Sequence, residues 1–248
     1  MRIDKEWLNL VAKLDFAFQP IIATKSGKLF AVEAFLRDTD KLGFKTILDF
    51  FNKAFEKNEL YNTDLLLRSK ALYKFIDIDI DDIIMFYNLD NRILFDKSYS
   101  RGNTTKILER LQLKKKSICF EISEKGNIQT TSELTKVLEN YKSEGFKIAL
   151  DDFGCGTSYI ELLYDSNPNF LKVNDFFIKF ISTDKKKQII LQSIVTLAHD
   201  LNIKVIVKGV ETLEEFKYCK KYDVDFVQGH FVQKAQKDNK NLQKRYDI

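Results

Sequence analysis

The stretch FAFQPIIATKSGKLFAVEAFL, residues 16–36, decides the fold of this chain. Residues 16–22 and 29–36 are rich in apolar and β-branched side chains, which is typical of strands. Only the short segment 24–28 separates them. Because a parallel connection needs about a dozen residues or more, two strands this close must pair antiparallel. The sequence therefore predicts an antiparallel hairpin as the first two strands of the sheet.

The rest of the chain alternates between strand and helix patterns. Further strands are predicted at residues 83–89, 117–122, 147–150, 170–173, 203–207 and 225–227. Helical periodicity occurs at residues 47–56, 64–76, 132–142, 186–199 and 213–221. Such alternation indicates a largely parallel sheet, and eight strands favour its closure. We therefore expect an α/β fold, a TIM-type (β/α)8 barrel whose first strand is antiparallel to the others.

The length of 248 residues suits one barrel domain spanning residues 1–248. Residues 1–15 have the pattern of an amphipathic helix, and the polar tail 237–248 is expected to fray at its end. The sequence shows neither a signal peptide nor a membrane span. The three cysteines lack CxxC spacing, which argues against disulfides and a zinc site. These features predict a cytoplasmic protein with no membrane partner.

Composition and motifs exclude several classes of function. The 44% hydrophobic and 13% aromatic content indicates a folded chain. The net charge of +4 arises from interspersed charges, so DNA is not an expected partner. The chain lacks a Walker A loop and a complete GxGxxG motif. Its two histidines have no nearby nucleophile elbow, which makes a catalytic triad improbable.

Polar residues recur where the predicted strands end, namely at Glu33, Asn88, Glu121, Asp151, Asp152, Lys172, Glu211 and Gln228. The carboxyl ends of barrel strands converge on one mouth. Carboxylates with an amide, and no His or Cys, suit hard cations such as Mg²⁺ or Mn²⁺. Singly, an acid at a strand end is more often a helix cap or turn residue than a metal ligand. The two adjacent aspartates can serve one site only if the backbone turns there, which Gly154 and Gly156 would permit.

The order and spacing of these motifs resemble those of EAL domains, the family that hydrolyses or senses the bacterial messenger cyclic di-GMP. The matching segments are Gln19-Pro-Ile21, Glu33-Ala-Phe-Leu-Arg37, Asn88-Leu89, Phe120-Glu-Ile-Ser-Glu124, Asp151-Asp-Phe-Gly-Cys-Gly156, Leu171-Lys-Val-Asn174, Gly209-Val-Glu-Thr212 and Gln228-Gly229. They span nearly the whole chain. The signature tripeptide reads Glu-Ala-Phe instead of Glu-Ala-Leu, and its carboxylate is retained. The resemblance implies a barrel with an antiparallel first strand, in agreement with the predicted hairpin.

The resemblance also implies a division of roles. Glu33, Asn88, Glu121 and Asp151 would hold one Mg²⁺ or Mn²⁺ ion, and Asp151 with Asp152 would reach a second. Glu33, Lys172 and Glu211 would take part in catalysis, with Lys172 orienting water or phosphate. Gln19, Arg37, Asn174 and Gln228 would contact the dinucleotide, and Glu124 would brace the loop after Asp152.

The implied reaction is hydrolysis of one phosphodiester of cyclic di-GMP to linear pGpG. The metals would lower the pKa of a bound water, and a nearby carboxylate would accept its proton. The implied partners are cyclic di-GMP, a second copy of the chain and a protein of the signalling pathway.

One departure from the family pattern affects this chemistry. Lys208 stands where EAL domains usually have a glutamate assigned to the second metal or to the general base. At about 4 Å its repulsion of a cation is worth roughly 1 to 4 kcal/mol. Asn174 replaces a common aspartate, and Cys155 and Thr157 are milder changes. We therefore expect a weak second metal site and impaired hydrolysis.

Two alternatives remain open at this point. If Lys208 points away from the mouth, or if Glu211 takes over the missing role, the chain would be an active phosphodiesterase. If the ligand is no longer bound, the domain would be a protein-interaction scaffold.

Overall fold

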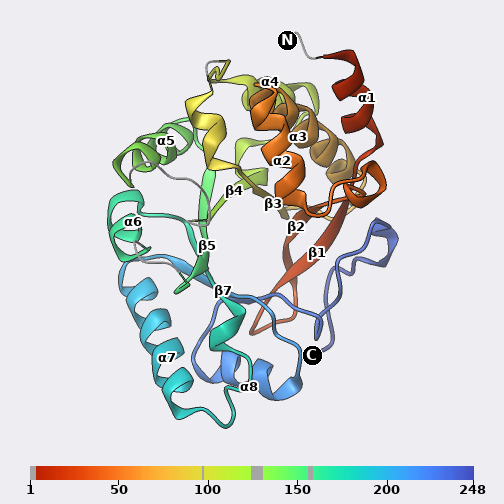
Figure 1. The fold of residues 1–248 in the computed structure, drawn as a ribbon. Helices are drawn as coiled ribbons and strands as arrows, with labels where there is room; N and C mark the ends of the chain where they lie inside the picture. The colour runs from red at the N-terminus through yellow and green to blue at the C-terminus, as the bar shows by residue number, and fades with distance from the viewer. Residues whose placement is uncertain (1–3, 97, 124–130, 156–158) are drawn as a thin grey trace.

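The computed structural model describes residues 4–96, 98–123, 131–155 and 159–248. Its strands close into one barrel in the order of the sequence (Figure 1). The strands are β1 (Asp15–Ala23), β2 (Leu29–Arg37), β3 (Ile84–Asn88), β4 (Ile118–Ser123), β5 (Lys147–Phe153), β6 (Phe170–Val173), β7 (Lys204–Val207) and β8 (Phe226–Val227). The predicted closed barrel is therefore confirmed.

The predicted hairpin is also confirmed. Strands β1 and β2 pair antiparallel, with Gln19 opposite Glu33. Strand β1 is antiparallel to β8 as well, whereas the other neighbouring pairs from β2 to β8 are parallel. One strand of reversed direction thus closes an otherwise parallel barrel.

Helices surround the barrel (Figure 1). They are α1 (Lys5–Lys13), α2 (Ile47–Glu56), α3 (Leu60–Ile76), α4 (Asn103–Arg110), α5 (Thr131–Ser143), α6 (Tyr159–Ser166), α7 (Lys185–Asp200) and α8 (Leu213–Lys221). The sequence patterns did not identify α4 or α6, because a helix of eight residues offers only about two turns of periodicity. The helix expected within residues 1–15 is α1. Its buried Trp7 donates a hydrogen bond to Thr63 Oγ1 at 2.7 Å and stacks on Phe50.

The barrel interior contains an apolar plug. It consists of Ile21, Ala31, Ile84, Phe86, Cys119, Ala149, Phe170 and Ile206, with Phe30 and Phe226 packed against it. Because successive strand residues face opposite sides, the residue two positions further along each strand also points inward. The plug therefore forms an apolar floor beneath the next layer of inward-pointing side chains, which lies nearer the mouth of the barrel.

The tail at residues 237–248 is attached to the barrel before its last residues. The backbone of this segment binds the turn of the hairpin, with Leu29 N donating to Lys244 O at 3.0 Å and Tyr246 N donating to Gly27 O at 2.9 Å. A Cβ atom on Gly27 would lie 2.2 Å from Tyr246 O, so only glycine allows this approach. Polar composition does not reveal these contacts, because main-chain atoms make them.

Cys119, Cys155 and Cys219 are all free thiols. None of the helices within the described ranges combines the length and apolar character that a membrane crossing requires.

An ion pair is buried between the barrel and its helices. Arg68 on α3 donates to Asp64 one turn earlier and to Thr104 on α4, and its guanidinium lies over the Phe120 ring. Both charged side chains are about 1% exposed. The pair thus joins α3, α4 and β4 through one cation.

Replacing only the cation of this pair should destabilise the fold strongly. Arg68→Met would leave Asp64 buried without its counterion, and we expect a loss of about 3–5 kcal/mol in the free energy of unfolding, measured by urea denaturation. Adding Asp64→Leu should recover part of that loss, because the remaining charge is then removed too. A single variant as stable as the parent chain would contradict this account.

Candidate active site

A ring of polar side chains lies directly above the apolar plug. From β2 to β8 its member follows a residue of the plug or its lining by two positions, as in Ala31 and Glu33 or Phe226 and Gln228, whereas on the reversed β1 Gln19 precedes Ile21 by two. The ring contains Gln19, Glu33, Asn88, Glu121, Asp151, Lys172, Lys208 and Gln228. All of these are residues that the sequence placed at strand ends or in the family motifs. The two-residue period of the strands therefore brings them together.

Lys172 lies at the centre of this ring and is fully buried. Its ammonium donates to Glu33 Oε2 at 2.7 Å and to Glu121 Oε1. Burial opposes the charge on Lys172, but the two carboxylates outweigh it and raise the pKa. Burial likewise opposes ionisation of Glu33, yet the ammonium lowers the pKa of that carboxyl to about 2. For Glu121, burial and the nearby charge of Glu33 raise the pKa well above the usual value.

Amide side chains complete the coordination of Glu33. Asn88 donates to Glu33 Oε1 at 2.9 Å, and Gln228 donates to Oε2 at 2.8 Å. Gln228 also lies 3.2 Å from Gln19 Oε1, and the Gln19 amide donates to the Gln233 carbonyl at 3.1 Å. The sequence reasoning missed Gln233, because it contributes a main-chain atom that no residue type signals.

Lys208 points into the mouth and binds both adjacent aspartates. Its Nζ lies 2.6 Å from Asp151 Oδ1 and donates to Asp152 Oδ1 at 2.7 Å. Asn174 donates to the same Asp152 oxygen at 2.8 Å. Burial opposes the charge on Lys208, but Asp151 outweighs it and the pKa is raised. The alternative in which Lys208 points away from the mouth is therefore wrong.

The backbone turns at Asp152 itself. This residue has a φ of 58°, in the left-handed region that non-glycine residues seldom occupy. The turn brings the Asp152 carboxylate to the same side as Asp151, although alternation alone would separate them. The expected turn at Gly154 and Gly156 thus begins earlier in the chain. Gly154 has a φ of 96° and continues it, while Gly156 lies outside the described residues.

Two candidate residues of the described part of the chain stand apart from this network. Arg37 donates to the Leu36 carbonyl and lies over the Phe35 ring, 5.3 Å from its centroid. Glu211 is exposed at the rim, and its main chain, not its carboxylate, is bonded to Glu215. Glu124 lies outside the described residues. The network assembled by the barrel is therefore smaller than the set suggested by the family motifs.

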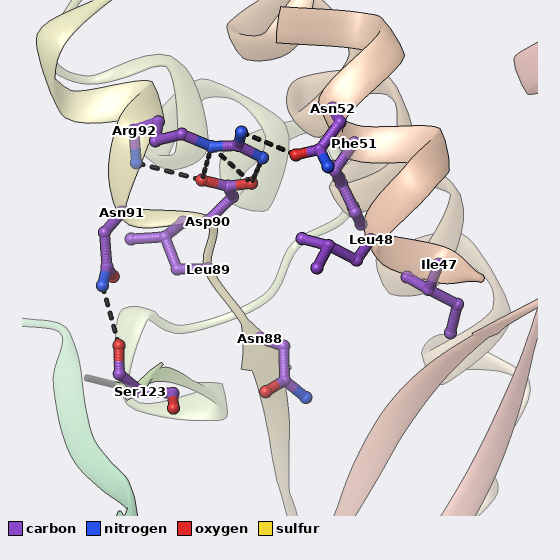
Figure 2. Close-up of a pocket in the computed structure, with 10 residues that line it drawn as sticks. All are labelled: Ile47, Leu48, Phe51, Asn52, Asn88, Leu89, Asp90, Asn91, Arg92 and Ser123. Carbon is purple, nitrogen blue, oxygen red and sulfur yellow. Dashed lines mark hydrogen bonds and ion pairs between the residues drawn. The ribbon is translucent and has the colours of Figure 1, made fainter. Parts of the chain in front are cut away.

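Two cavities open at this end of the barrel. One, of about 260 Å³, is lined by Glu33, Asn88, Asp151, Lys208, Glu211 and Gln228, among others. The other, of about 600 Å³, lies between α2 and the turn after β3 (Figure 2). Leu48 and Phe51 line it, and Arg92 is fixed there by Asp90 and Asn52. Asn88 lines both cavities, so a ligand that extends from one into the other would pass this side chain.

The donor atoms fit one hard cation better than two. Glu33, Asn88, Glu121 and Asp151 supply oxygen donors, and Glu121 Oε2 is buried with no hydrogen-bond partner within the described ranges. In those ranges, however, no group of three acidic, histidine or cysteine side chains converges as a metal site. At the second position the carboxylates of Asp151 and Asp152 face the Lys208 ammonium. These residues do not fit a second divalent ion.

The fold and the polar mouth together define a TIM-type barrel with a reversed first strand and an oxygen-rich site at the carboxyl ends of its strands. The chain belongs to the EAL domain family, whose model matches residues 9–235.

Similar proteins support this assignment. The probable cyclic di-GMP phosphodiesterase PdeN of Escherichia coli K12 is 27% identical over 241 residues, which cover 94% of this chain but only 46% of PdeN. A standalone EAL protein from Vibrio cholerae, solved with cyclic di-GMP, is 28% identical with a TM-score of 0.78, covering 90% of this chain and 92% of that one. Klebsiella pneumoniae BlrP1, solved with manganese and cyclic di-GMP, is 27% identical with a TM-score of 0.80, covering 90% and 56%.

Removing the central ammonium should destabilise the barrel in a manner that depends on pH. With Lys172→Met, Glu33 and Glu121 would be buried without a counterion, and we expect a loss of about 3–5 kcal/mol at pH 7. Their pKa values would then lie above those of the unfolded chain, so the loss should shrink as the pH falls toward about 4.5. In the parent chain the lowered Glu33 pKa has the opposite effect, because its contribution is lost as the pH falls toward 2.

Urea denaturation at several pH values would measure this. Lys217→Met, on the exposed side of α8, is the matched control and should show neither the loss nor the pH dependence. Equal losses for Lys172→Met at pH 7 and pH 4.5 would contradict the electrostatic explanation.

Proposed function

We propose that this EAL domain binds cyclic di-GMP in bacterial second-messenger signalling and hydrolyses it to pGpG slowly or not at all. The observation that carries the proposal is the arrangement of the mouth. Glu33, Asn88 and Gln228 form one hydrogen-bonded cluster. Beside it, Lys208 binds Asp151 and Asp152. The chain thus has the residues that the family motifs assign to ligand binding. Lys208 occupies the position that the family usually assigns to the general base or the second metal.

Binding is supported by residues that line the small cavity. Gln228 donates to Gln19 and Glu33, and Gln19 donates to the Gln233 carbonyl, so the orientation of both amides is fixed before a ligand arrives. The larger cavity beside Asn88 offers Leu48 and Phe51 as apolar walls for a nucleobase (Figure 2). Arg37 donates to the Leu36 carbonyl through one nitrogen of its guanidinium, which leaves other N–H groups for a ligand.

Hydrolysis is opposed by charge. A general base must accept a proton, and the protonated amine of Lys208, whose pKa is raised, has no free lone pair for it. Glu211 is exposed, and within the described residues its carboxylate forms no hydrogen bond or ion pair with the ring that would position it as a replacement base. We therefore favour a binding domain over an active phosphodiesterase.

One Mg²⁺ or Mn²⁺ ion would be held by Glu33, Asn88, Glu121 and Asp151. When bound, it would polarise a phosphoryl oxygen and acidify a water. Lys172 would keep Glu33 and Glu121 oriented, and it would move only if the ion displaced its ammonium from their oxygens.

Restoring the family glutamate should restore hydrolysis. We expect the parent chain to form pGpG at well below about 1 s⁻¹ with Mg²⁺ or Mn²⁺, and Lys208→Glu to be at least about tenfold faster. The new carboxylate would supply both a proton acceptor and a metal ligand. Separation of cyclic di-GMP from pGpG by chromatography gives the rate.

Lys217→Glu makes the same charge change on the exposed side of α8 and should leave the rate unchanged. A parent chain with ordinary turnover would favour the active phosphodiesterase instead. Calorimetry with cyclic di-GMP tests binding separately, and absence of heat with and without divalent ions would favour the scaffold alternative.

A further inference from the structure

The Lys208 ammonium has more hydrogen-bonding capacity than its partners use. An ammonium carries three N–H groups, and its contacts to Asp151 and Asp152 account for at most two. No third acceptor is found for it within the described part of the chain. The side chain is 20% exposed and lines the small cavity. One N–H of a fixed cation is therefore available to a ligand in that cavity.

Two constrained backbone positions, at Asp152 and at Gly209, help to define where this ammonium lies. The left-handed turn at Asp152 directs one carboxylate toward it. Gly209, the residue after Lys208, has a φ of 70°, and a Cβ there would lie 2.4 Å from Asp175 Cβ. Asn174 donates to the same Asp152 oxygen and helps to hold that carboxylate in place. A cation fixed in this way loses little conformational freedom when it binds an anion.

The formal charge of the mouth changes with the residue at position 208. With every acid counted as ionised, the four carboxylates of Glu33, Glu121, Asp151 and Asp152 face two ammonium groups, which leaves a formal charge of −2. A glutamate at 208 would give five carboxylates and one ammonium, a formal charge of −4. Buried charge must be compensated. The lysine thus removes the need for a second divalent ion.

We propose that the Lys208 ammonium takes the place of a second metal ion and donates its remaining N–H to a phosphodiester oxygen of the bound cyclic dinucleotide. Asp152 is then a tether for this cation and not a metal ligand. The inference rests on the proposed function, since it concerns the same ligand. It assigns phosphate recognition to position 208, where EAL domains usually have a glutamate that serves the second metal or acts as the general base.

The test compares two affinities in the same variants. Removing the charge with Lys208→Gln should weaken binding of cyclic di-GMP at least about tenfold in calorimetry, since a charge-assisted hydrogen bond is lost. The same variant should bind Mn²⁺ as tightly as the parent or more tightly, measured by electron paramagnetic resonance without nucleotide, because a repulsive charge is removed. Lys208→Arg should retain most of the dinucleotide affinity.

The outcomes separate the inference from the proposed function. If Lys208→Gln binds cyclic di-GMP as tightly as the parent, or if it loses Mn²⁺ and dinucleotide together, the phosphate contact is wrong. If the parent chain binds no cyclic di-GMP under any condition, the proposed function itself fails. Lys217→Gln, the exposed control, should change neither affinity, and thermal unfolding of each variant shows that the barrel is intact.

Discussion

The ammonium of Lys172 between Glu33 and Glu121 is the interaction on which the rest of the site depends. These side chains are almost entirely buried above an apolar floor, where water cannot compensate their charge. Two carboxylates in such a place repel each other unless a cation separates them. The lysine meets this requirement from within the chain, and its position fixes the carboxylate oxygens to which Asn88 and Gln228 donate.

Much of this arrangement followed from the sequence, because strand geometry has a period of two. The five residues between the first strands required an antiparallel hairpin, and the polar residues at later strand ends had to meet at one mouth. The same period also decides where Lys208 points. Ile206 belongs to the apolar plug, so the residue two positions later faces inward. The orientation of Lys208, which the family motif left open, is thus fixed by strand β7, which ends one residue before it.

The features that the sequence did not reveal depend on main-chain atoms or on rare backbone states. The left-handed turn occurs at Asp152, an ordinary residue, although two glycines nearby suggested a later position. The tail is held by carbonyl and N–H groups at Lys244 and Tyr246, which every residue type possesses. Gln233 reaches the site through its carbonyl for the same reason. Residue identity carries little information about such contacts.

A single change of charge separates two properties that a phosphodiesterase normally combines. Hydrolysis assisted by metal ions needs negative charge to hold cations and a free lone pair to accept a proton. Recognition of a phosphodiester needs positive charge and N–H donors. A glutamate at position 208 would serve the first requirement and oppose the second, whereas the tethered ammonium of Lys208 has the reverse effect on both. Because Lys172, Glu33 and Asn88 form their bonds independently of this residue, the change alters the charge of the mouth without dismantling its ring.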